Sequence, residues 1–337
     1  GETPGVLAAG PASVAPAEAD RQVVLGDGRR LAYNVYGDPD GRPVLYLHGF
    51  PGSRLEAGLT NAAAYRLGLR MVAPDRPGMG RSDPLAGRRF TDWPADVAQL
   101  ADALGWERFP IIGMSGGSPY ALACAAGLAE RVSRVAVVAG MGPPDAPQGT
   151  RDMRWFGRLE LWLARFWPAA AGLFFRWAVR TTLDHPQSAP GWVDGRLPAA
   201  DRQTLMRPEI ARLFRDSVRE SVRQGVADHL AEMRLLGQPW GFRLDGIATP
   251  VRLMLGRLLG LAGPLCGLPP APLLGHLLPR RGALLPAGQS RPGHPGRPQG
   301  AWPMTRALEK PFSQACENNK DPILAVLREV FADPGLV

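Results

Sequence analysis

The stretch FPIIGMSGGSPYALACAAG, residues 109–127, limits the possible fold of this chain more than any other part of it. A β-rich run ends at Met114, Ser115 follows, and a helix-forming run begins without a loop between them. Residues 113–117 fit the pattern G-x-S-x-G, which places a serine on a strained turn between a strand and a helix. This predicts that Ser115 is a nucleophile, and the alternative is a glycine-rich turn of a nucleotide-binding fold.

Strand and helix patterns alternate along the first half of the chain. Two β-rich runs flank Gly26-Asp27-Gly28 and predict a hairpin near the N-terminus. Helical patterns separate the later strand runs, and the alternation predicts an α/β fold whose mostly parallel sheet has helices on both faces. The further strands are expected at 43–49, 70–75, 109–114, 134–140 and 249–256.

Between residues 142 and 245 the sequence is helical in pattern and lacks strand signals, which predicts a helical cap inserted over the carboxyl edge of the sheet. The aromatic residues among its arginines indicate a hydrophobic acyl or leaving group in the substrate, unless the rings face solvent or pack on one another. The aromatic residues in question are Trp155, Phe156, Trp162, Phe166, Trp167, Phe174, Phe175 and Trp177. The expected domains are a disordered lead-in at 1–20, the core at 21–141, the cap at 142–245 and a core strand at 246–256.

The loop HGFPGSR, residues 48–54, follows a predicted strand directly and is called the oxyanion loop here. The backbone amides of Phe50 and Gly116 are the predicted donors to a developing oxyanion. His48 is expected to shape this loop rather than act as a base. Asp75 and Arg76, in the run APDRPGMGRSDP, are expected to fix the neighbouring loop by hydrogen bonds.

Four runs in this order resemble the α/β-hydrolase superfamily, in particular capped bacterial hydrolases of the proline-iminopeptidase-like type. The runs are HGFPGSR, DRPGMGRSDP, DWPADVAQLADALG and GMSGGSPYALACAAG, and the resemblance covers about residues 21–255. It implies Ser115 as the nucleophile and Phe50 and Gly116 as the oxyanion donors. It implies no metal or organic cofactor, and it leaves the substrate open because that superfamily hosts many chemistries.

The family order of a catalytic triad is serine, acid, histidine. Leu259 occupies the place where the resemblance implies an aspartate, and His276 comes too early for the expected histidine. One explanation is divergence, in which Asp145 serves as the acid and His294 as the base. The other explanation is that residues 257–303 are frameshifted or disordered, since they contain no Asp, Glu, Lys, Tyr, Phe, Ile or Asn. The C-terminal part of the sheet is then incomplete.

Residues 304–337 regain charged residues and predict a terminal helix. They weakly resemble the start of a bacterial methyltransferase-like family, and an ordinary amphipathic helix is the alternative. No glycine-rich cofactor loop occurs in this segment, so no cofactor is implied.

The formal net charge of +8 suggests a nucleic-acid partner, but its distribution argues against one. Seven arginines and no acidic residue lie between Asp245 and Glu309, which leaves +1 of the +8 for the rest of the chain. The apolar stretches 161–179 and 251–285 contain arginines and prolines, so no membrane partner is expected. The three cysteines (Cys124, Cys266 and Cys316) and the absence of a signal-peptide pattern at the N-terminus indicate a cytoplasmic protein.

The sequence thus predicts a serine hydrolase that acts on an ester, amide or related bond of a small hydrophobic molecule through an acyl-enzyme at Ser115. The alternative is a catalytically dead hydrolase-fold remnant that at most binds ligands, because the acid and the histidine of the triad are not at their expected places.

Overall fold

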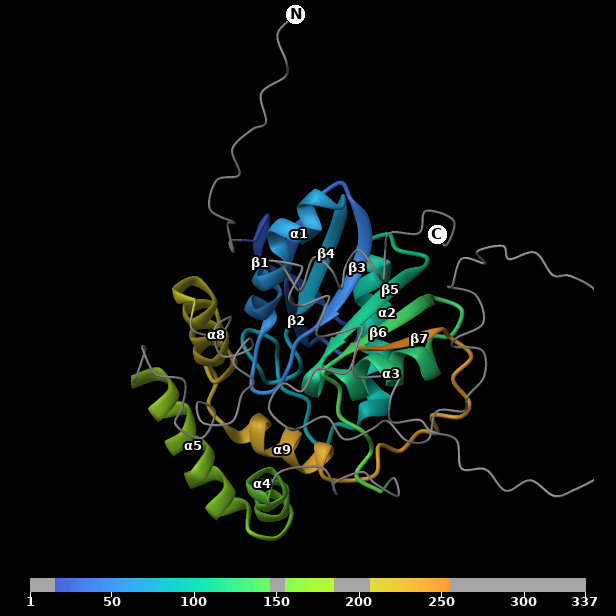
Figure 1. The fold of residues 1–337 in the computed structure, drawn as a ribbon. Helices are drawn as coiled ribbons and strands as arrows, with labels where there is room; N and C mark the ends of the chain where they lie inside the picture. Colours follow the sequence, from blue (N-terminus) through green and yellow to red (C-terminus); the bar gives the residue numbers. More distant parts are fainter. Residues whose placement is uncertain (1–15, 146–154, 185–206, 255–337) are drawn as a thin grey trace, which may run out of the picture.

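The computed structural model describes residues 16–145, 155–184 and 207–254. Within these ranges seven strands form one sheet in the order β1-β2-β4-β3-β5-β6-β7 (Figure 1). Strands β3 to β7 pair in parallel, whereas β1 pairs antiparallel with β2 and β2 pairs antiparallel with β4. The mostly parallel α/β sheet predicted from the sequence is confirmed.

The strands coincide with the predicted runs to within a few residues. They comprise Glu18–Val24 (β1), Arg30–Gly37 (β2), Arg42–Leu47 (β3), Leu69–Pro74 (β4), Phe109–Met114 (β5), Val132–Val138 (β6) and Val251–Met254 (β7). The helical elements of the core, with η for 3-10 turns, are Arg54–Thr60 (η1), Asn61–Arg66 (α1), Phe90–Asp92 (η2), Trp93–Ala103 (α2), Ser115–Gly117 (η3) and Ser118–Gly127 (α3). The predicted segments 257–303 and 304–337 lie outside the described residues.

The N-terminal hairpin begins earlier than predicted. Strand β1 starts at Glu18, so the predicted disordered lead-in at 1–20 is too long at its C-terminal end. Ala17 N donates to Val35 O at 2.8 Å, which extends the pairing with β2 before the strand itself. The sequence did not indicate this pairing, because the Ala/Pro-rich residues before Arg21 have little strand propensity of their own and form the strand by pairing with β2.

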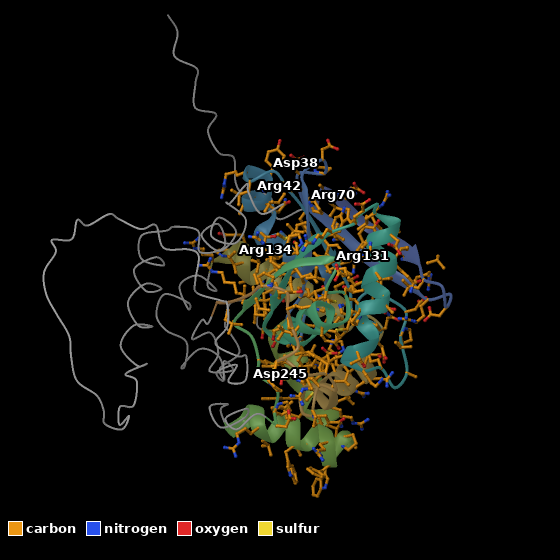
Figure 2. All side chains as sticks on the ribbon, turned by 90° about the vertical axis from the view of Figure 1, so that its right-hand side faces the viewer. Asp38, Arg42, Arg70, Arg131, Arg134 and Asp245 are labelled. Carbon is orange, nitrogen blue, oxygen red and sulfur yellow. The ribbon has the colours of Figure 1, made fainter. Side chains whose placement is uncertain are left out.

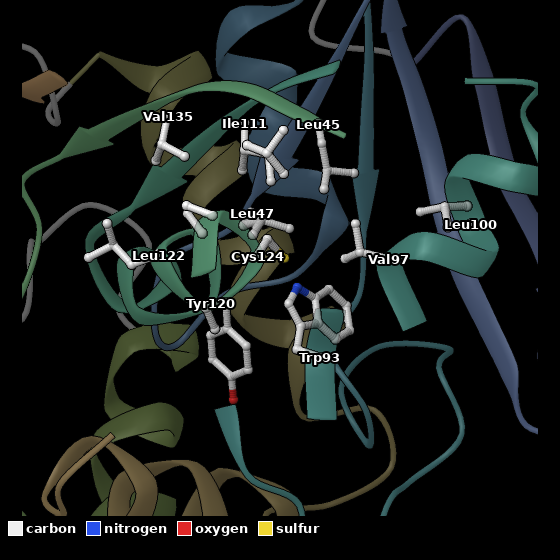
Figure 3. Packing of buried hydrophobic residues seen from close by; sticks show 14 of the residues in the cluster. Leu45, Leu47, Trp93, Val97, Leu100, Ile111, Tyr120, Leu122, Cys124 and Val135 are labelled. Atoms are coloured by element: carbon white, nitrogen blue, oxygen red, sulfur yellow. The ribbon is translucent and has the colours of Figure 1, made fainter. Parts of the chain in front are cut away.

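The two faces of the sheet are covered by different helices. Successive residues of a strand point to opposite faces, so Leu45 and Leu47 of β3 join a core with α2 and α3, whereas Val44 and Tyr46 join a smaller core with α1. Figure 3 shows the larger core, to which α2 contributes Trp93, Val97 and Leu100. Helices therefore cover both faces, as the alternation of runs predicted.

Helix α3 is enclosed by the rest of the core. All residues from Ser118 to Ala125 are buried, and Tyr120, Leu122 and Cys124 pack in the larger core (Figure 3). Cys124 is a free cysteine, and burial raises the pKa of its thiol. A helix packed on all sides is held firmly, and this one begins directly after the turn that carries Ser115.

Strand β6 is tied to the end of α2 by one arginine. Arg131, labelled in Figure 2, lies just before β6, and its Nη1 donates to Asp102 Oδ1 at 2.7 Å. Its Nη2 donates to Trp106 O at 2.5 Å. These contacts fix the start of the strand that leads toward the helical segment.

Four described helices lie between β6 and β7 along the chain, and in Figure 1 they stand below the sheet and to its left. They are Trp155–Phe166 (α4), Pro168–Asp184 (α5), Pro208–Ser221 (α8) and Ala227–Leu236 (α9). The described part of this segment contains no strand, and its helices share a small apolar cluster that includes Phe175, Val218 and Met233. We call these four helices the cap. None of the helices that the structure describes is long and apolar enough to cross a bilayer.

Most described aromatic side chains of α4, of α5 and of the residue between them point to solvent. Trp162, Trp167 and Trp177 are 48%, 63% and 57% exposed, whereas Phe175 is only 3% exposed. Of the two interpretations given above, the solvent-facing one therefore holds for these tryptophans. Among the described aromatic side chains of α4 and α5, Phe175 alone is buried.

Candidate active site

Ser115 is the first residue after β5, and its backbone has φ = 47°. This left-handed conformation costs a non-glycine residue about 1–2 kcal/mol. Such a cost persists only where the surrounding structure holds the residue, and it is concentrated at functional sites. The strained strand-to-helix turn that the sequence predicted is present, with Ser115 half-buried at the carboxyl end of a central strand.

Gly113 and Gly117 are required because neighbouring atoms approach their Cα atoms too closely for a side chain. A Cβ atom on Gly117 would lie 2.3 Å from Leu47 O, and one on Gly113 would lie 2.8 Å from the Cβ atom of Ala121. Both distances are under 3.0 Å, which a non-bonded Cβ atom essentially never shows. The glycines of G-x-S-x-G thus let β5, α3 and the end of β3 meet around Ser115.

Ser118 fastens the turn to the neighbouring strand. Its Oγ donates to Ser115 O at 2.6 Å and accepts from Met141 N at 3.0 Å. Met141 follows β6, so the serine turn and the loop leaving β6 are held together by one buried hydroxyl.

The two predicted oxyanion donors lie side by side. A Cβ atom built on Gly116 would lie 3.2 Å from Phe50 N and 2.7 Å from Phe50 Cβ. These residues are 66 positions apart in the sequence, but β3 and β5 are adjacent and parallel, so both loops emerge at the same edge of the sheet. A side chain at position 116 would fill the space between the two backbones.

A buried carboxylate holds the oxyanion loop in place. Gly49 N donates to Glu56 Oε1 at 2.9 Å, and the Tyr46 hydroxyl donates to the same oxygen at 2.9 Å. Burial raises the pKa of Glu56, while the Gly49 amide and the Tyr46 hydroxyl act in the opposite direction. Since Gly49 precedes Phe50, Glu56 sets the direction in which the loop enters the site.

His48 has the structural role that the sequence analysis expected. It is fully buried, its Nδ1 lies 2.9 Å from Gly49 O, and its Nε2 accepts from Arg76 N at 3.3 Å. Burial and the positive charge of Arg76 hold the pKa of His48 well below its usual range. Arg76 also donates to His48 O and, at 2.9 Å, to Gly49 O, so the pair locks the start of the oxyanion loop.

Asp75 also acts by fixing loops, as expected. Its carboxylate accepts from Arg54 N at 2.7 Å and from Arg54 Nη1 at 2.6 Å, and all these groups are buried. The same guanidinium lies 2.9 Å from Glu220 Oε1 on α8. Ser53 N donates to Ser217 Oγ of α8 at 2.9 Å. Helix α8 of the cap is therefore attached to the end of the oxyanion loop.

A second buried network attaches α9 to the core. Glu232 of α9 is fully buried; its Oε1 lies 3.1 Å from Arg76 Nε and its Oε2 lies 2.8 Å from Arg88 Nη2. The Tyr120 hydroxyl of α3 donates to Glu232 Oε2 at 2.5 Å. One carboxylate thus joins the cap, the loop after β4 and the helix that follows Ser115.

The cap meets the oxyanion loop through apolar rings. The ring of Phe50 stacks on that of Phe175 of α5, with centroids 5.7 Å apart, and lies 5.8 Å from the ring of His229 of α9. His229 is buried, its Nε2 lies 3.1 Å from Ser221 Oγ, and burial lowers its pKa to about 3. An apolar surface with a neutral imidazole therefore borders the site.

Within the described part of the chain, no hydrogen bond joins the predicted acid, Asp145, to Ser115, and the predicted base, His294, lies outside that part. Asp145 is exposed on a turn after β6, at the same edge of the sheet as Ser115. His294, with His276 and Leu259, lies outside the described residues. The two described histidines, His48 and His229, have the other partners given above.

Sequence reasoning missed the cap residues that hold the site, namely Ser217, Glu220, His229 and Glu232. Glu220 and Glu232 stand in helical patterns rich in arginine, where a glutamate is usually solvated. No sequence signal identifies such a glutamate as attached to the core, because Arg54, Arg76 and Arg88, which these two glutamates contact, lie more than a hundred residues away in the chain.

Comparison with known proteins agrees with this geometry. Residues 42–193 match the family described as alpha/beta hydrolase fold. The chain is 38% identical over 109 residues to "Probable proline iminopeptidase" of Streptomyces coelicolor. The matched part is 29% of this chain and 32% of that protein. It is 35% identical over 123 residues to "Non-heme chloroperoxidase" of Streptomyces lividans, with 36% of this chain and 45% of that protein covered. The chain thus spans less than half the length of these relatives.

Among solved structures, an epoxide hydrolase from Vigna radiata is similar, with a TM-score of 0.52 and 18% identity. The similarity covers 71% of this chain and 79% of that one and shows the fold alone. Taken together, the sheet, the family match and the relatives show that this chain has the α/β-hydrolase fold and is distantly related, over about 30% of its length, to proline iminopeptidases and other bacterial hydrolases.

Proposed function

We propose that the chain is a serine hydrolase that cleaves an ester, amide or related bond of a small hydrophobic molecule through an acyl-enzyme at Ser115. The observation that carries this proposal is the backbone of Ser115, whose φ of 47° aims the residue out of the strand-to-helix turn. A serine without a catalytic task gains nothing from this strained conformation, which glycine adopts at no steric cost.

In the proposed reaction, Ser115 Oγ attacks the carbonyl carbon and the oxygen of that carbonyl becomes negatively charged. The amides of Phe50 and Gly116 stabilise this charge, and each such donor typically contributes about 10²–10³ in rate. The N-terminal end of α3 adds its positive dipole near Gly116. The leaving group departs with a proton, and water then hydrolyses the acyl-enzyme.

Deprotonation of Ser115 requires a base. We propose His294 as this base and Asp145 as the acid of the triad. Asp145 lies after β6, and the loop leaving that strand is tied to the serine turn by Ser118. This placement at the carboxyl edge of the sheet supports Asp145 as a candidate.

The hydrophobic substrate class rests on the rings beside the oxyanion loop. The ring of Phe50, in the oxyanion loop, stacks on that of Phe175, and the neighbouring apolar cluster of the cap adds Leu163 and Leu230. Such a surface stabilises an apolar acyl or leaving group by removing it from water. The buried free thiol of Cys124 supports the cytoplasm as the proposed compartment.

Labelling with a fluorophosphonate probe, followed by intact mass, tests the proposal on the full chain. We expect one adduct on the wild type, none on Ser115→Ala, and an undiminished adduct on the matched control Ser133→Ala, whose serine lies half-buried on β6. Turnover of a p-nitrophenyl ester is expected to fall by up to about 10⁶ in Ser115→Ala, since serine and base act as a unit.

A wild type that neither reacts with the probe nor turns over the ester contradicts the proposal and supports the non-catalytic alternative. That alternative draws on one observation: among the described residues, no histidine or carboxylate is bonded to the Ser115 side chain. If the probe labels Ser115, His294→Ala and Asp145→Asn then show whether these two residues complete the triad.

A further inference from the structure

The outer helices of the cap carry most of the large apolar side chains that the described molecule exposes. Seven of the ten lie on α4, on α5 or on the residue between them, and we call these seven the aromatic face. Its members are Leu159, Trp162, Phe166, Trp167, Leu173, Phe174 and Trp177, with exposed fractions from 39% to 70%. Exposed apolar residues scattered singly are ordinary, but a gathered set marks an interaction surface.

The rings of the aromatic face form two groups. Trp162 lies 5.5 Å from Phe166 and 6.2 Å from Trp167, measured between ring centroids, and Phe174 lies 5.8 Å from Trp177. Helices α4 and α5 stand at the outer edge of the molecule, on the side of the cap away from the sheet (Figure 1). Their inner sides are already used, because Phe175 and Val179 pack in the cap cluster.

The charges beside the aromatic face are mainly positive. Arg158, Arg165, Arg176 and Arg180 are exposed on the same two helices, whose only acidic residues are Glu160 and Asp184. Arg165 lies over the ring of Phe166, 5.3 Å from its centroid, and Arg180 pairs with Asp184 at 3.5 Å. Arginines therefore border the exposed rings on both helices.

We propose that the aromatic face binds the surface of an anionic lipid bilayer. Tryptophan and phenylalanine settle at the headgroup level of a bilayer, and arginines beside them attract anionic headgroups. A second copy of the chain fits this face less well, because a self-complementary contact brings its arginines against each other. The expectation of no membrane partner rested on the lack of a spanning segment, and a helix lying on the surface needs no span.

In this arrangement the cap makes contacts on two opposite surfaces. The inner side of α5 touches the oxyanion loop through Phe175, while the outer sides of α4 and α5 rest on the lipid. Bilayer contact then holds the cap at the boundary where apolar molecules collect. The inference stands whether or not Ser115 is catalytic.

Cosedimentation of the full chain with lipid vesicles tests the inference. We expect binding to vesicles of equal parts phosphatidylcholine and phosphatidylglycerol, weaker binding to phosphatidylcholine alone, and release by salt. The double variant Trp167→Ser/Trp177→Ser is expected to bind at least about tenfold more weakly, equivalent to about 1.4 kcal/mol. The matched control is Tyr65→Ser on α1, which removes a ring that is 67% exposed outside the aromatic face and leaves binding unchanged.

Three results overturn the inference. The first is a wild type that binds neither kind of vesicle. The second is a double variant that binds as the wild type does. The third is a dimer in size-exclusion chromatography without lipid that the double variant abolishes, which assigns the face to a second copy. Far-UV circular dichroism checks that both variants keep the helical content of the wild type.

Discussion

Replacing Glu232 by glutamine removes the one negative charge that two buried guanidinium groups share. Arg76 and Arg88 have side chains that are 1% and 3% exposed, and both lie within 3.1 Å of the Glu232 carboxylate. The amide of Glu232→Gln fills nearly the same volume, so the packing of α9 is retained. What changes is the electrostatic balance between the cap and the core.

The expected loss in the free energy of unfolding depends on the partners that each arginine retains in the variant. Removing one partner of a buried ion pair typically costs about 3–5 kcal/mol, because a charge is left in the interior without compensation. Arg76 keeps the carbonyl oxygens of His48 and Gly49, and Arg88 keeps Asp228 Oδ1 at 3.6 Å. These contacts place the expected loss near the lower end, at about 3 kcal/mol.

Urea denaturation followed by circular dichroism measures this loss. Since Glu232 attaches α9, we expect the cap to unfold at a lower urea concentration than the sheet, as a separate first transition. The matched control is Asp245→Asn, which removes an exposed carboxylate paired with Arg243 and is expected to leave the curve unchanged. A Glu232→Gln curve that superimposes on the control and the wild type refutes the reasoning, because the buried charges then need no common carboxylate.

Three further perturbations test other parts of the structure. His229 has a pKa of about 3 in the folded chain and about 6.5 when unfolded, so the unfolded state binds the extra proton and stability falls by about 1.4 kcal/mol per pH unit as the pH drops between these values. Urea midpoints measured at several pH values give this dependence of stability on pH. We expect His229→Asn to lack the part that comes from His229, while the buried carboxylates contribute equally to the variant and the wild type. Gly117→Ala places a Cβ atom 2.3 Å from Leu47 O and is expected to lower the free energy of unfolding by about 3 kcal/mol or more. In the control Gly246→Ala the added Cβ atom meets no neighbouring atom. Equal thermal midpoints for the two variants contradict this account. Ser115→Gly relieves the left-handed strain of about 1–2 kcal/mol, while the greater freedom of glycine in the unfolded chain costs about 0.5–1 kcal/mol. It should therefore be more stable than Ser115→Ala, although both variants lack the serine hydroxyl. A less stable glycine variant means that the turn is not strained.

The sheet could be predicted from the sequence because its strands are continuous apolar runs. Residues 43–49 and 109–114 carry that signal without help from the rest of the chain, and the glycines around Ser115 identify the turn. The adjacency of Phe50 and Gly116 followed from the resemblance, and the structure shows its cause in the pairing of β3 with β5.

The attachment of the cap could not be predicted. It depends on pairs such as Arg54 with Glu220 and Arg88 with Glu232, which join residues far apart in the sequence. A local pattern reports only the propensity of its own segment, and a glutamate at a buried helical position looks the same as one in water. For the same reason the sequence left open which aromatic residues of the cap face inward, and only Phe175 does so among the described rings.

The long connection between β6 and β7 has a consequence for how such chains change over time. These strands are parallel neighbours, and a crossover between parallel neighbours requires about a dozen residues. Here it has about a hundred, which is roughly three doublings of loop length and costs only about 2 kcal/mol of closure entropy. Insertion, deletion or replacement of whole helices in this crossover therefore leaves the strand register almost unaffected. The sheet can keep Ser115 in place while the surface above it is exchanged as a unit.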